Sequence, residues 1–389
     1  MPKRSTDLNG QHNNAEEKIL IDQNKSVTRV AAIAMVIFAG ALPAAAAEGV
    51  PVFRVDITWP QPLPNNWILG QVSGVATDAE DHVWILQRPA SLSEDERGAT
   101  TSPPLSKCCA PAPPVLEFDA GGKLLRAWGG AGKGYDWPAN EHGIHVDPMG
   151  FVWVTGNGPN DGQILKFTRD GKFVLQIGKV GPQTGSADTT RLGQPASVEV
   201  DAAANEVYVA DGYHNRRVIV FAADTGAYKR HWGAYGKPPV DGPRQGRTHP
   251  PTAAQLQNFG NPVHCARVSK DGMVYVCDRI NNRIQVFKKD GSFVKEFSVE
   301  PNTAGNGSVW DIALSRDPQQ RYLFLADGRN NQVLTLSRDS GAVLSQLGRP
   351  GRYAGEFHWV HDLAIDSAGN LYAGEVDNGK RVQRFLRQP

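Results

Sequence analysis

Histidine is the side chain that most often binds transition metals and changes its charge near neutral pH, and the chain has 10 histidines among 389 residues. Two of them, His142 and His145, lie three residues apart at the start of a strand-like run, Glu141 to Gly156. They could bind one ion together, only one of them could act, or both could be structural. The stretch alone leaves these alternatives open, and the repeats around it decide between them.

The sequence beyond residue 50 repeats a pattern of alternating apolar residues that ends in an Asp or Ser turn. The six copies have their turn positions at Asp78, Asp147, Asp201, Ser269, Ser315 and Asp366. Most copies continue into two further strand-like runs joined by a Gly-containing turn, as in "NRIQVFKKDGSFVKEF". Four short antiparallel strands per repeat are typical of a propeller blade. The sequence therefore predicts an all-β protein, a six-bladed β-propeller over residues 49–389.

The end of the last repeat predicts how the ring closes. It stops at "RVQRFLRQP", which leaves no room for a fourth strand. The segment Val52 to Trp59, "VFRVDITW", alternates apolar and polar residues and has no partner of its own. We expect this N-terminal strand to become the outer strand of the last blade and to close the ring, because that leaves no free edge between the first and last blades.

The repeat also gives a common register for the histidines. Counting five residues back from each turn position gives Ser73, His142, Ala196, His264, Trp310 and His361. Histidine occupies every second blade, whereas His145 has no counterpart. Inner strands line the channel of a propeller, so residues on alternate blades of six lie about 120° apart and converge. Three histidines with an open fourth position are typical of catalytic zinc; copper(II) or nickel(II) could use the same ligands, and three unrelated structural histidines are the alternative.

Residues that close the second strand of each blade should share the channel mouth with these histidines, because the first two strands form a hairpin. They include Arg88, Arg279 and the turn at Tyr213. Arginine can grip a carboxylate in two places. A tyrosine beside a cation and a metal-bound hydroxyl could ionise and act as a base. The pattern predicts a site for a small molecule or peptide with a carboxylate, although each residue alone could equally be solvated or salt-bridged.

The first 48 residues differ from the rest of the chain. Val30 to Leu42 is an apolar run after Lys25 and Arg29, and small residues follow it up to Ala47. This arrangement predicts a signal peptide behind a polar N-terminal extension, with an uncleaved anchor as the alternative. We expect a periplasmic or secreted protein that has no stable membrane insertion after cleavage.

Charge and cysteine usage limit the partners. The net charge of +1 provides no field for nucleic acid, so we expect no nucleic-acid partner, and we expect a monomer. The four cysteines, Cys108, Cys109, Cys265 and Cys277, lack the spacing of a zinc knuckle. A structural or disulfide role is expected for them, and their pairing is open.

Five stretches carry a resemblance to a known family: "GQVSGVATD", "EHGIHVDPMGFVWVTG", "VYVADGYHNRRVIVF", "PVHCARVSKDGMVYVCDRINNRIQVF" and "VHDLAIDSAGNLYAGEV". From about Val52 onward the chain resembles NHL-repeat propellers, and among them the peptidyl-α-hydroxyglycine α-amidating lyases. The resemblance implies a zinc-dependent carbon–nitrogen lyase that cleaves a carbinolamide N–C bond to give an amide and glyoxylate. It also implies zinc on His142, His264 and His361, a catalytic Tyr213 with Arg88 and Arg279, and a structural calcium on the carbonyls of Val75 and Ile144 and the carboxylate of Asp362.

Two positions depart from the family. His214 follows Tyr213 where the family has a cysteine, and Trp359 stands where its animal members have a methionine, two residues before the last zinc histidine. The second change would reshape the substrate pocket. Two other classes of function stay open: a non-catalytic NHL propeller that binds a peptide, glycan or protein, and a metal-dependent hydrolase of the lactonase or streptogramin-lyase type.

Overall fold

Runs rich in β-branched and aromatic residues, each ended by a turn, form the strands of the computed structural model, which describes residues 49–243 and 248–389. The expected signal peptide lies outside the described residues. In the described ranges, no helix is both long enough and apolar enough to cross a membrane.

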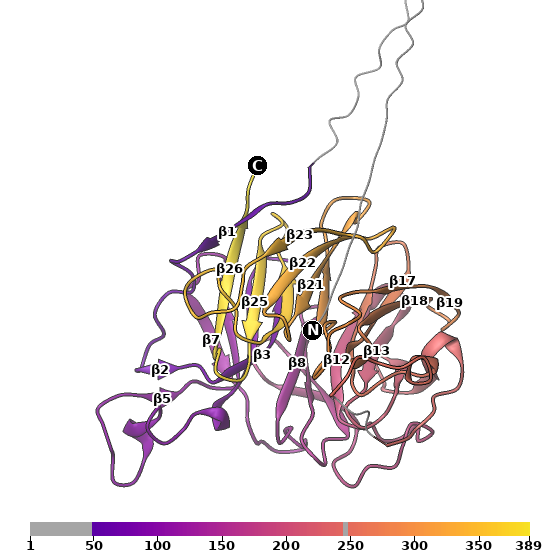
Figure 1. Ribbon diagram of the computed structural model, residues 1–389. Coiled ribbons are helices and arrows are strands. Elements are labelled where there is room, and N and C mark those ends of the chain that lie inside the picture. The colour runs from indigo at the N-terminus through magenta and orange to yellow at the C-terminus, as the bar shows by residue number, and fades with distance from the viewer. Residues whose placement is uncertain (1–48, 244–247) are drawn as a thin grey trace, which may run out of the picture. The chain divides into compact units, whose positions relative to one another are not determined.

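Six four-stranded antiparallel sheets follow one another along the chain (Figure 1). The first three consist of β3 (Gln71–Thr77), β4 (Val83–Arg88), β6 (Val115–Phe118) and β7 (Leu124–Trp128); β8 (Glu141–Val146), β9 (Val152–Gly156), β10 (Gln163–Phe167) and β11 (Phe173–Gly178); and β12 (Pro195–Asp201), β13 (Glu206–Asp211), β14 (Arg217–Ala222) and β15 (Tyr228–Trp232). The last three consist of β16 (Val263–Val268), β17 (Met273–Asp278), β18 (Arg283–Lys288) and β19 (Phe293–Ser298); β20 (Asp311–Leu314), β21 (Tyr322–Asp327), β22 (Gln332–Ser337) and β23 (Val343–Leu347); and β24 (Val360–Ile365), β25 (Leu371–Glu375), β26 (Arg381–Arg387) and β1 (Phe53–Asp56). This order confirms the predicted all-β, six-bladed propeller.

The Asp turns that defined the repeat fix the hairpin between the first two strands of a blade. In the second blade, Asp147 Oδ1 accepts hydrogen bonds from the backbone N–H groups of Met149 and Phe151, and its Oδ2 accepts one from the Trp153 indole at 2.9 Å. Gly150 has a φ of +82°, which glycine adopts at little cost. One carboxylate therefore holds both the turn and the first core tryptophan of the second strand.

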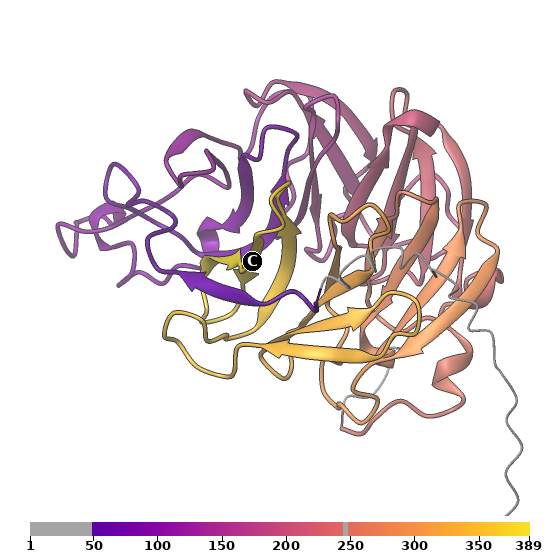
Figure 2. The ribbon, with the colours of Figure 1, turned by 90° about the horizontal axis from the view of Figure 1, so that it is seen from above.

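The core lies between the blades. Six clusters of buried apolar side chains each join two neighbouring sheets. One of them packs Val72 and Val83 of the first sheet against Ala364, Tyr372 and Val382 of the last, so the ring is continuous. In Figure 2 the colours of the chain follow one another around a common centre.

The sixth sheet combines the two ends of the described chain. Strand β1 pairs antiparallel with β26, from Phe53 opposite Arg387 to Asp56 opposite Arg384, and Arg384 Nε donates to Asp56 Oδ2 at 3.0 Å. The strand is shorter than the predicted Val52 to Trp59. Figure 2 shows indigo β1 beside the yellow C-terminal strand.

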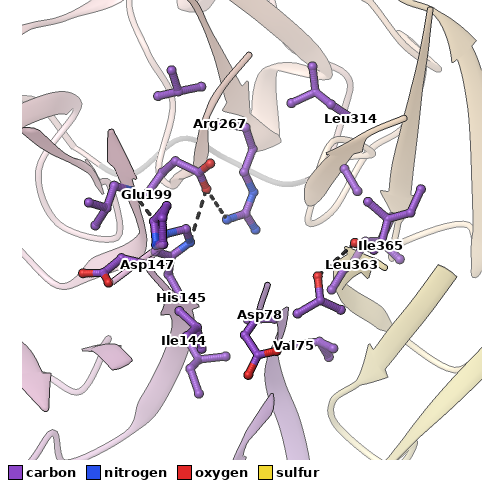
Figure 3. Close-up of a pocket in the computed structure, with 18 of the residues that line it drawn as sticks. Val75, Asp78, Ile144, His145, Asp147, Glu199, Arg267, Leu314, Leu363 and Ile365 are labelled. Carbon is purple, nitrogen blue, oxygen red and sulfur yellow. Dashed lines mark hydrogen bonds and ion pairs between the residues drawn. The ribbon is translucent and has the colours of Figure 1, made fainter. Parts of the chain in front are cut away.

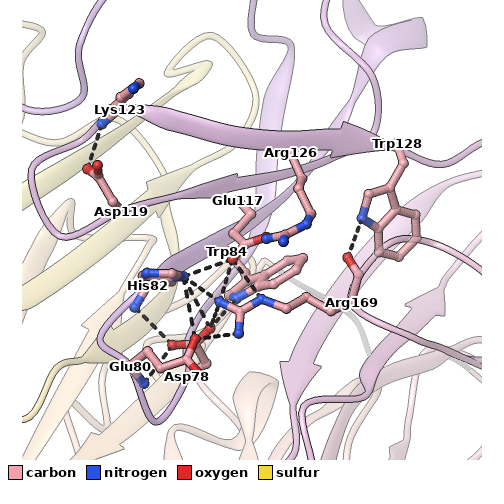
Figure 4. Close-up of polar contacts among 10 residues, drawn as sticks. All are labelled: Asp78, Glu80, His82, Trp84, Glu117, Asp119, Lys123, Arg126, Trp128 and Arg169. Carbon is pink, nitrogen blue, oxygen red and sulfur yellow. Dashed lines mark hydrogen bonds and ion pairs between the residues drawn. The ribbon is translucent and has the colours of Figure 1, made fainter.

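A polar cluster joins the first two blades (Figure 4). Arg169 donates to Asp78 Oδ2 at 2.9 Å and to Glu117 Oε1 at 2.9 Å, and it also pairs with Glu80. Glu117 is fully buried. A buried carboxylate needs such a partner, because leaving it uncompensated costs several kcal/mol.

Two long loops extend from the blades. The first, between β4 and β6, contains the 3-10 helices η1 (Pro89–Ser91) and η2 (Gly98–Thr100), a disulfide between Cys108 and Cys109, and β5 (Ala110–Pro111). Strand β5 pairs parallel with β2 (Trp67–Ile68), which lies before β3. The second contains η4 (Ala234–Gly236) and η5 (Gln255–Gln257), while η3 (Ala202–Ala204) and η6 (Arg279–Asn281) close hairpins. Cys265 and Cys277 form a disulfide between neighbouring strands of the fourth blade.

Candidate metal centre

Each register histidine is the second residue of an inner strand, His142 of β8, His264 of β16 and His361 of β24. At each of these positions the pairing with the second strand shifts register, as in a β-bulge. A bulge re-aims a side chain relative to regular pleating and is frequent next to active sites. Local backbone irregularity therefore turns all three histidines the same way.

The three imidazoles meet in a nearly equilateral triangle. Their ring centroids lie 4.7 to 4.9 Å apart, and one ligand atom from each lies within 4.8 Å of the others. All three residues are almost completely buried, at 2 to 3% exposure. We refer to His142, His264 and His361 as the histidine centre.

One hydrogen bond orients each imidazole. The Nδ1 of His142, His264 and His361 lies 2.8, 2.5 and 2.7 Å from the backbone carbonyl oxygens of Ala196, Trp310 and Ser73. These acceptors are the register residues of the next blade around the ring. A carbonyl oxygen only accepts, so Nδ1 carries the proton and the Nε2 lone pair is left for another partner. The backbone thus fixes the tautomer that a metal ligand needs.

Burial keeps these rings neutral. It lowers the pKa of all three imidazoles well below their ordinary value, and neighbouring ionisable groups lower it further: His361 and Arg88 act on His142, and Arg279 acts on His264. Neutral imidazole is the form that binds a metal. Three converging neutral nitrogens fit a zinc ion with an open fourth position, and they would also fit copper(II) or nickel(II).

Tyr213 lies directly at the histidine centre. Its Oη is 2.8 Å from His142 Nε2 and 3.1 Å from His264 Nε2, and it accepts a hydrogen bond from Arg279 Nη1 at 3.0 Å. The turn before it is tight, because a Cβ on Gly212 would lie 2.0 Å from the carbonyl oxygen of Val263. His214, which departs from the family pattern, is exposed.

The two arginines at the histidine centre make different contacts. Arg279 is 4% exposed, and its guanidinium carbon lies 4.5 Å from the centroid of the Trp310 ring. Arg88 donates from Nε to the Glu141 carbonyl oxygen at 2.6 Å and from Nη1 to Gln71 Oε1 at 2.7 Å. Its charge acts on His142 and His361, and burial lowers its own pKa from the ordinary value. The histidines, the tyrosine and both arginines are therefore brought to one end of the channel.

Trp310 has a role that the sequence did not predict. It occupies the register of the fifth blade, and it both accepts the His264 hydrogen bond through its carbonyl and stacks on Arg279 through its ring. Its ring also meets Trp359 edge-on, with centroids 5.3 Å apart. The register itself was the signal: the blades between the histidines supply the carbonyl oxygens that orient them.

His145 makes its contacts outside the histidine centre. Its Nε2 lies 3.4 Å from the Val200 N–H, and its Nδ1 lies 3.5 Å from Glu199 Oε2. It lines a cavity of about 350 Å³ together with Val75, Ile144 and Arg267 (Figure 3).

One of the three residues predicted to hold calcium, Asp362, meets a cation of the chain. The Asp362 carboxylate lies 3.3 Å from Arg267 Nη2, and burial together with the Asp311 carboxylate raises the pKa of Asp362 well above its usual range. The single carboxylate of the predicted donor set is thus already paired. Arg267 therefore competes with calcium for this carboxylate, and calcium binding stays a prediction of the resemblance.

Two other groups in the described residues have metal-ligand composition, Cys265 with Cys277 and Asp311, and Asp78 with Glu80 and His82. The first contains a disulfide, and the carboxylates of the second pair with Arg169. Within the ranges that the structure describes, both groups therefore already use their ligand atoms in a disulfide or in ion pairs. The histidine centre contains neither a disulfide nor a carboxylate.

The molecule is therefore a six-bladed β-propeller with three inner-strand histidines converging at one end of its channel. No family model matches the sequence. The chain is similar to NHL repeat-containing protein 3 of Mus musculus, at 25% identity over 86% of this chain and 84% of that protein. It is 27% identical to peptidyl-glycine alpha-amidating monooxygenase B of Xenopus laevis over 82% of this chain, and the match spans 34% of the frog protein.

Two further comparisons agree with these. The Caenorhabditis elegans protein named "Probable peptidyl-alpha-hydroxyglycine alpha-amidating lyase pgal-1" is 22% identical over 81% of this chain and 82% of its own length. A solved structure of a Bacteroides thetaiotaomicron protein of unknown function superposes with a TM-score of 0.52 at 14% identity, covering 82% of this chain and 70% of that one. The last comparison supports the fold alone. The sequence thus resembles NHL-repeat proteins and amidating-lyase proteins.

Proposed function

We propose that the protein is a zinc-dependent carbon–nitrogen lyase that acts on an α-hydroxyglycine substrate. The observation that carries this proposal is the position of Tyr213 Oη within 3.1 Å of two Nε2 atoms of the histidine centre and 3.0 Å from Arg279 Nη1. A metal-binding triangle needs no tyrosine to bind its ion. A phenol between the ligands and a cation is suited to take a proton from a group bound there.

The reaction would need no second reactant, because the proton removed from the substrate returns to it. Tyr213 would take the proton of the carbinol hydroxyl, the C–N bond would break as the aldehyde of glyoxylate forms, and the same proton would return to the departing amide nitrogen. A zinc ion bound by the three histidines would supply Lewis acidity for the hydroxyl oxygen. Arg279, which donates a hydrogen bond to Tyr213 Oη, would hold the phenol oxygen in place at the histidine centre.

The arginines would also provide recognition. A glyoxylate-forming substrate ends in a carboxylate, and Arg88 and Arg279 are planar donors that match this group. The buried setting strengthens such a contact, because fewer waters compete for it. The Cys265–Cys277 disulfide supports the further proposal that the protein works in the periplasm or outside the cell.

A second candidate is a non-catalytic propeller that binds a peptide, glycan or protein. It is favoured by the similarity to mouse NHL repeat-containing protein 3, which covers 84% of a protein whose name describes repeats and no reaction. In that case the metal would have a structural role.

The test uses the full chain, with metal content measured by mass spectrometry and an N-acyl-α-hydroxyglycine as substrate. We expect about one zinc per chain, glyoxylate release by the wild type, and a loss on the order of 10² to 10⁴-fold in Tyr213→Phe with zinc retained. The matched control is Tyr353→Phe, because Tyr353 is 81% exposed. A zinc-loaded wild type that releases no glyoxylate above background would reject the lyase and favour the binding module. Equal rates in wild type and Tyr213→Phe would keep the enzyme but remove Tyr213 from its mechanism.

A further inference from the structure

Arg267 lies on the same inner strand as His264, three residues further along β16, and it lines the channel cavity with Glu199 and His145 (Figure 3). Its Nη2 is 2.8 Å from Asp311 Oδ1 and 3.3 Å from Asp362 Oδ1, and its Nη1 is 3.5 Å from Glu199 Oε2. The three carboxylates come from β12, β20 and β24, on three other blades. One guanidinium therefore connects four of the six blades across the channel.

These carboxylates have little access to water. The side chain of Asp311 is 3% exposed, that of Asp362 is 8% exposed, and that of Glu199 is 21% exposed. Asp311 also uses its second oxygen to accept the Leu363 N–H at 3.0 Å. Carboxylates converging in a buried place repel one another and need a cation. Arg267, at 12% exposure, meets that need from within the chain.

We propose that Arg267 takes the place of a structural calcium ion: its guanidinium neutralises Asp362, the one carboxylate of the predicted calcium set, and links it to Asp311 and Glu199 of two other blades. Calcium takes six to eight oxygen ligands at 2.3 to 2.6 Å. Here the guanidinium already contacts the Asp362 carboxylate, and its positive charge repels a divalent cation. We refer to Arg267 with these three residues as the arginine cluster.

Arg267 differs from an ordinary salt-bridge partner in what its removal would leave behind. Removal of the guanidinium leaves three carboxylates from three blades facing one space, which is the donor type that calcium prefers. The Arg267→Ala variant should therefore gain a calcium dependence that the wild type lacks.

The experiment measures the thermal unfolding of the full chain, dialysed and then given millimolar calcium or magnesium chloride, with calcium content determined by mass spectrometry. The wild type should carry no stoichiometric calcium, and its Tm should not respond to calcium. The Tm of Arg267→Ala should fall on the order of 5–10 °C, and calcium should restore a large part of this loss while magnesium restores little. The matched control is Arg316→Ala, because Arg316 donates to the Ile365 carbonyl at the same cavity and removing it frees no carboxylate.

Several outcomes would overturn the proposal. One calcium per wild-type chain after dialysis, or a wild-type Tm that rises with calcium, would show that the metal is still used. A destabilised Arg267→Ala that ignores calcium would reduce Arg267 to an ordinary ion-pair partner. If Arg267→Ala does not fold, the two wild-type measurements still decide the question. All these readouts are independent of glyoxylate release, so a failure here is distinct from a failure of the proposed lyase.

Discussion

The histidine centre and the arginine cluster share the inner strands β16 and β24, yet they handle positive charge in opposite ways. The histidine centre presents three neutral nitrogens, each oriented by a carbonyl of the next blade. The arginine cluster presents three carboxylates, and the chain supplies their cation in Arg267. His264 and Arg267 lie about 10 Å apart along one strand. Neutral imidazoles can stay buried without an ion, whereas a carboxylate buried without a cation costs free energy or has a raised pKa.

The largest effect should come from a substitution that separates the two sites on one strand. His142 belongs to the histidine centre, and His145, three residues further along β8, contacts Glu199 beside the arginine cluster. We expect His142→Ala to lose the zinc and more than about 100-fold of the glyoxylate release, since even a residue that only orients a ligand is worth 10–100-fold. His145→Ala should keep both. If His142→Ala retains full zinc by mass spectrometry, the histidine centre is not the zinc site and the contrast with the arginine cluster fails.

The next effect concerns stability without loss of metal. Asp311→Asn removes the carboxylate with the shortest contact to Arg267, at 2.8 Å, and leaves the guanidinium partly unmatched. Breaking a buried pair from one side costs about 3 kcal/mol or more, so the free energy of unfolding in urea should fall by about that amount. Zinc content should not change.

The control for this prediction is Asp339→Asn. Asp339 forms an exposed pair with Lys295 at 3.7 Å, and such pairs contribute between zero and about 1 kcal/mol. Equal losses in the two variants would mean that the arginine cluster behaves like surface charge. Loss of zinc in Asp311→Asn would mean that the two sites are not separable.

The register of the repeats made the convergence of the three histidines predictable, because one phase relation placed them at the same position of alternate inner strands. The arginine cluster was not predictable in the same way. Arg267 is separated from Asp311 by 44 residues and from Asp362 by 95, and no local pattern states which buried charges will meet. The resemblance led instead to calcium on Asp362. An arginine on an inner strand, in "HCARVS", was the available signal, because a charge facing a closed channel requires a partner.

The fourth and fifth blades differ in how they partner an equivalent buried carboxylate: one has a cation beside it and the other does not. Asp278 closes β17 and accepts from Arg283 Nε at 2.8 Å. Asp327 closes β21 in the same way, but its partner is Gln332, with Nε2 at 3.0 Å. Burial raises the pKa of Asp327 from 3.8 to about 6. The folded protein therefore holds this proton more tightly than the unfolded chain does.

This difference predicts a pH dependence. Because the folded pKa is raised, stability is greatest below pH 4 for this group and is lost as the pH rises through about 6, by up to about 3 kcal/mol. Gln332→Arg would supply the missing cation, so it should stabilise the protein at pH 7 and much less at pH 4.5. Urea unfolding at both values measures this. Arg283→Gln is the reciprocal variant and should introduce the same loss in the fourth blade; a pH-independent effect of both would refute the assignment.

The smallest effect should come from the aromatic wall of the histidine centre. Trp359 lies two residues before His361, its backbone φ is +54°, and its N–H donates to Asn331 Oδ1 at 2.7 Å. Its ring packs on Trp310, which in turn stacks on Arg279. We expect this wall to contact the acyl part of the substrate.

In Trp359→Met the backbone strain is unchanged, so the fold and the zinc should persist, while aromatic contact worth about 1 kcal/mol is lost. The ratio of kcat/KM for an aromatic over a small acyl group should then fall by less than about tenfold, whereas Trp67→Met, a half-buried tryptophan on β2 outside the site, should leave the ratio unchanged. If this ratio of kcat/KM values does not change in Trp359→Met, the acyl group does not contact the aromatic wall, and recognition is confined to the histidine centre.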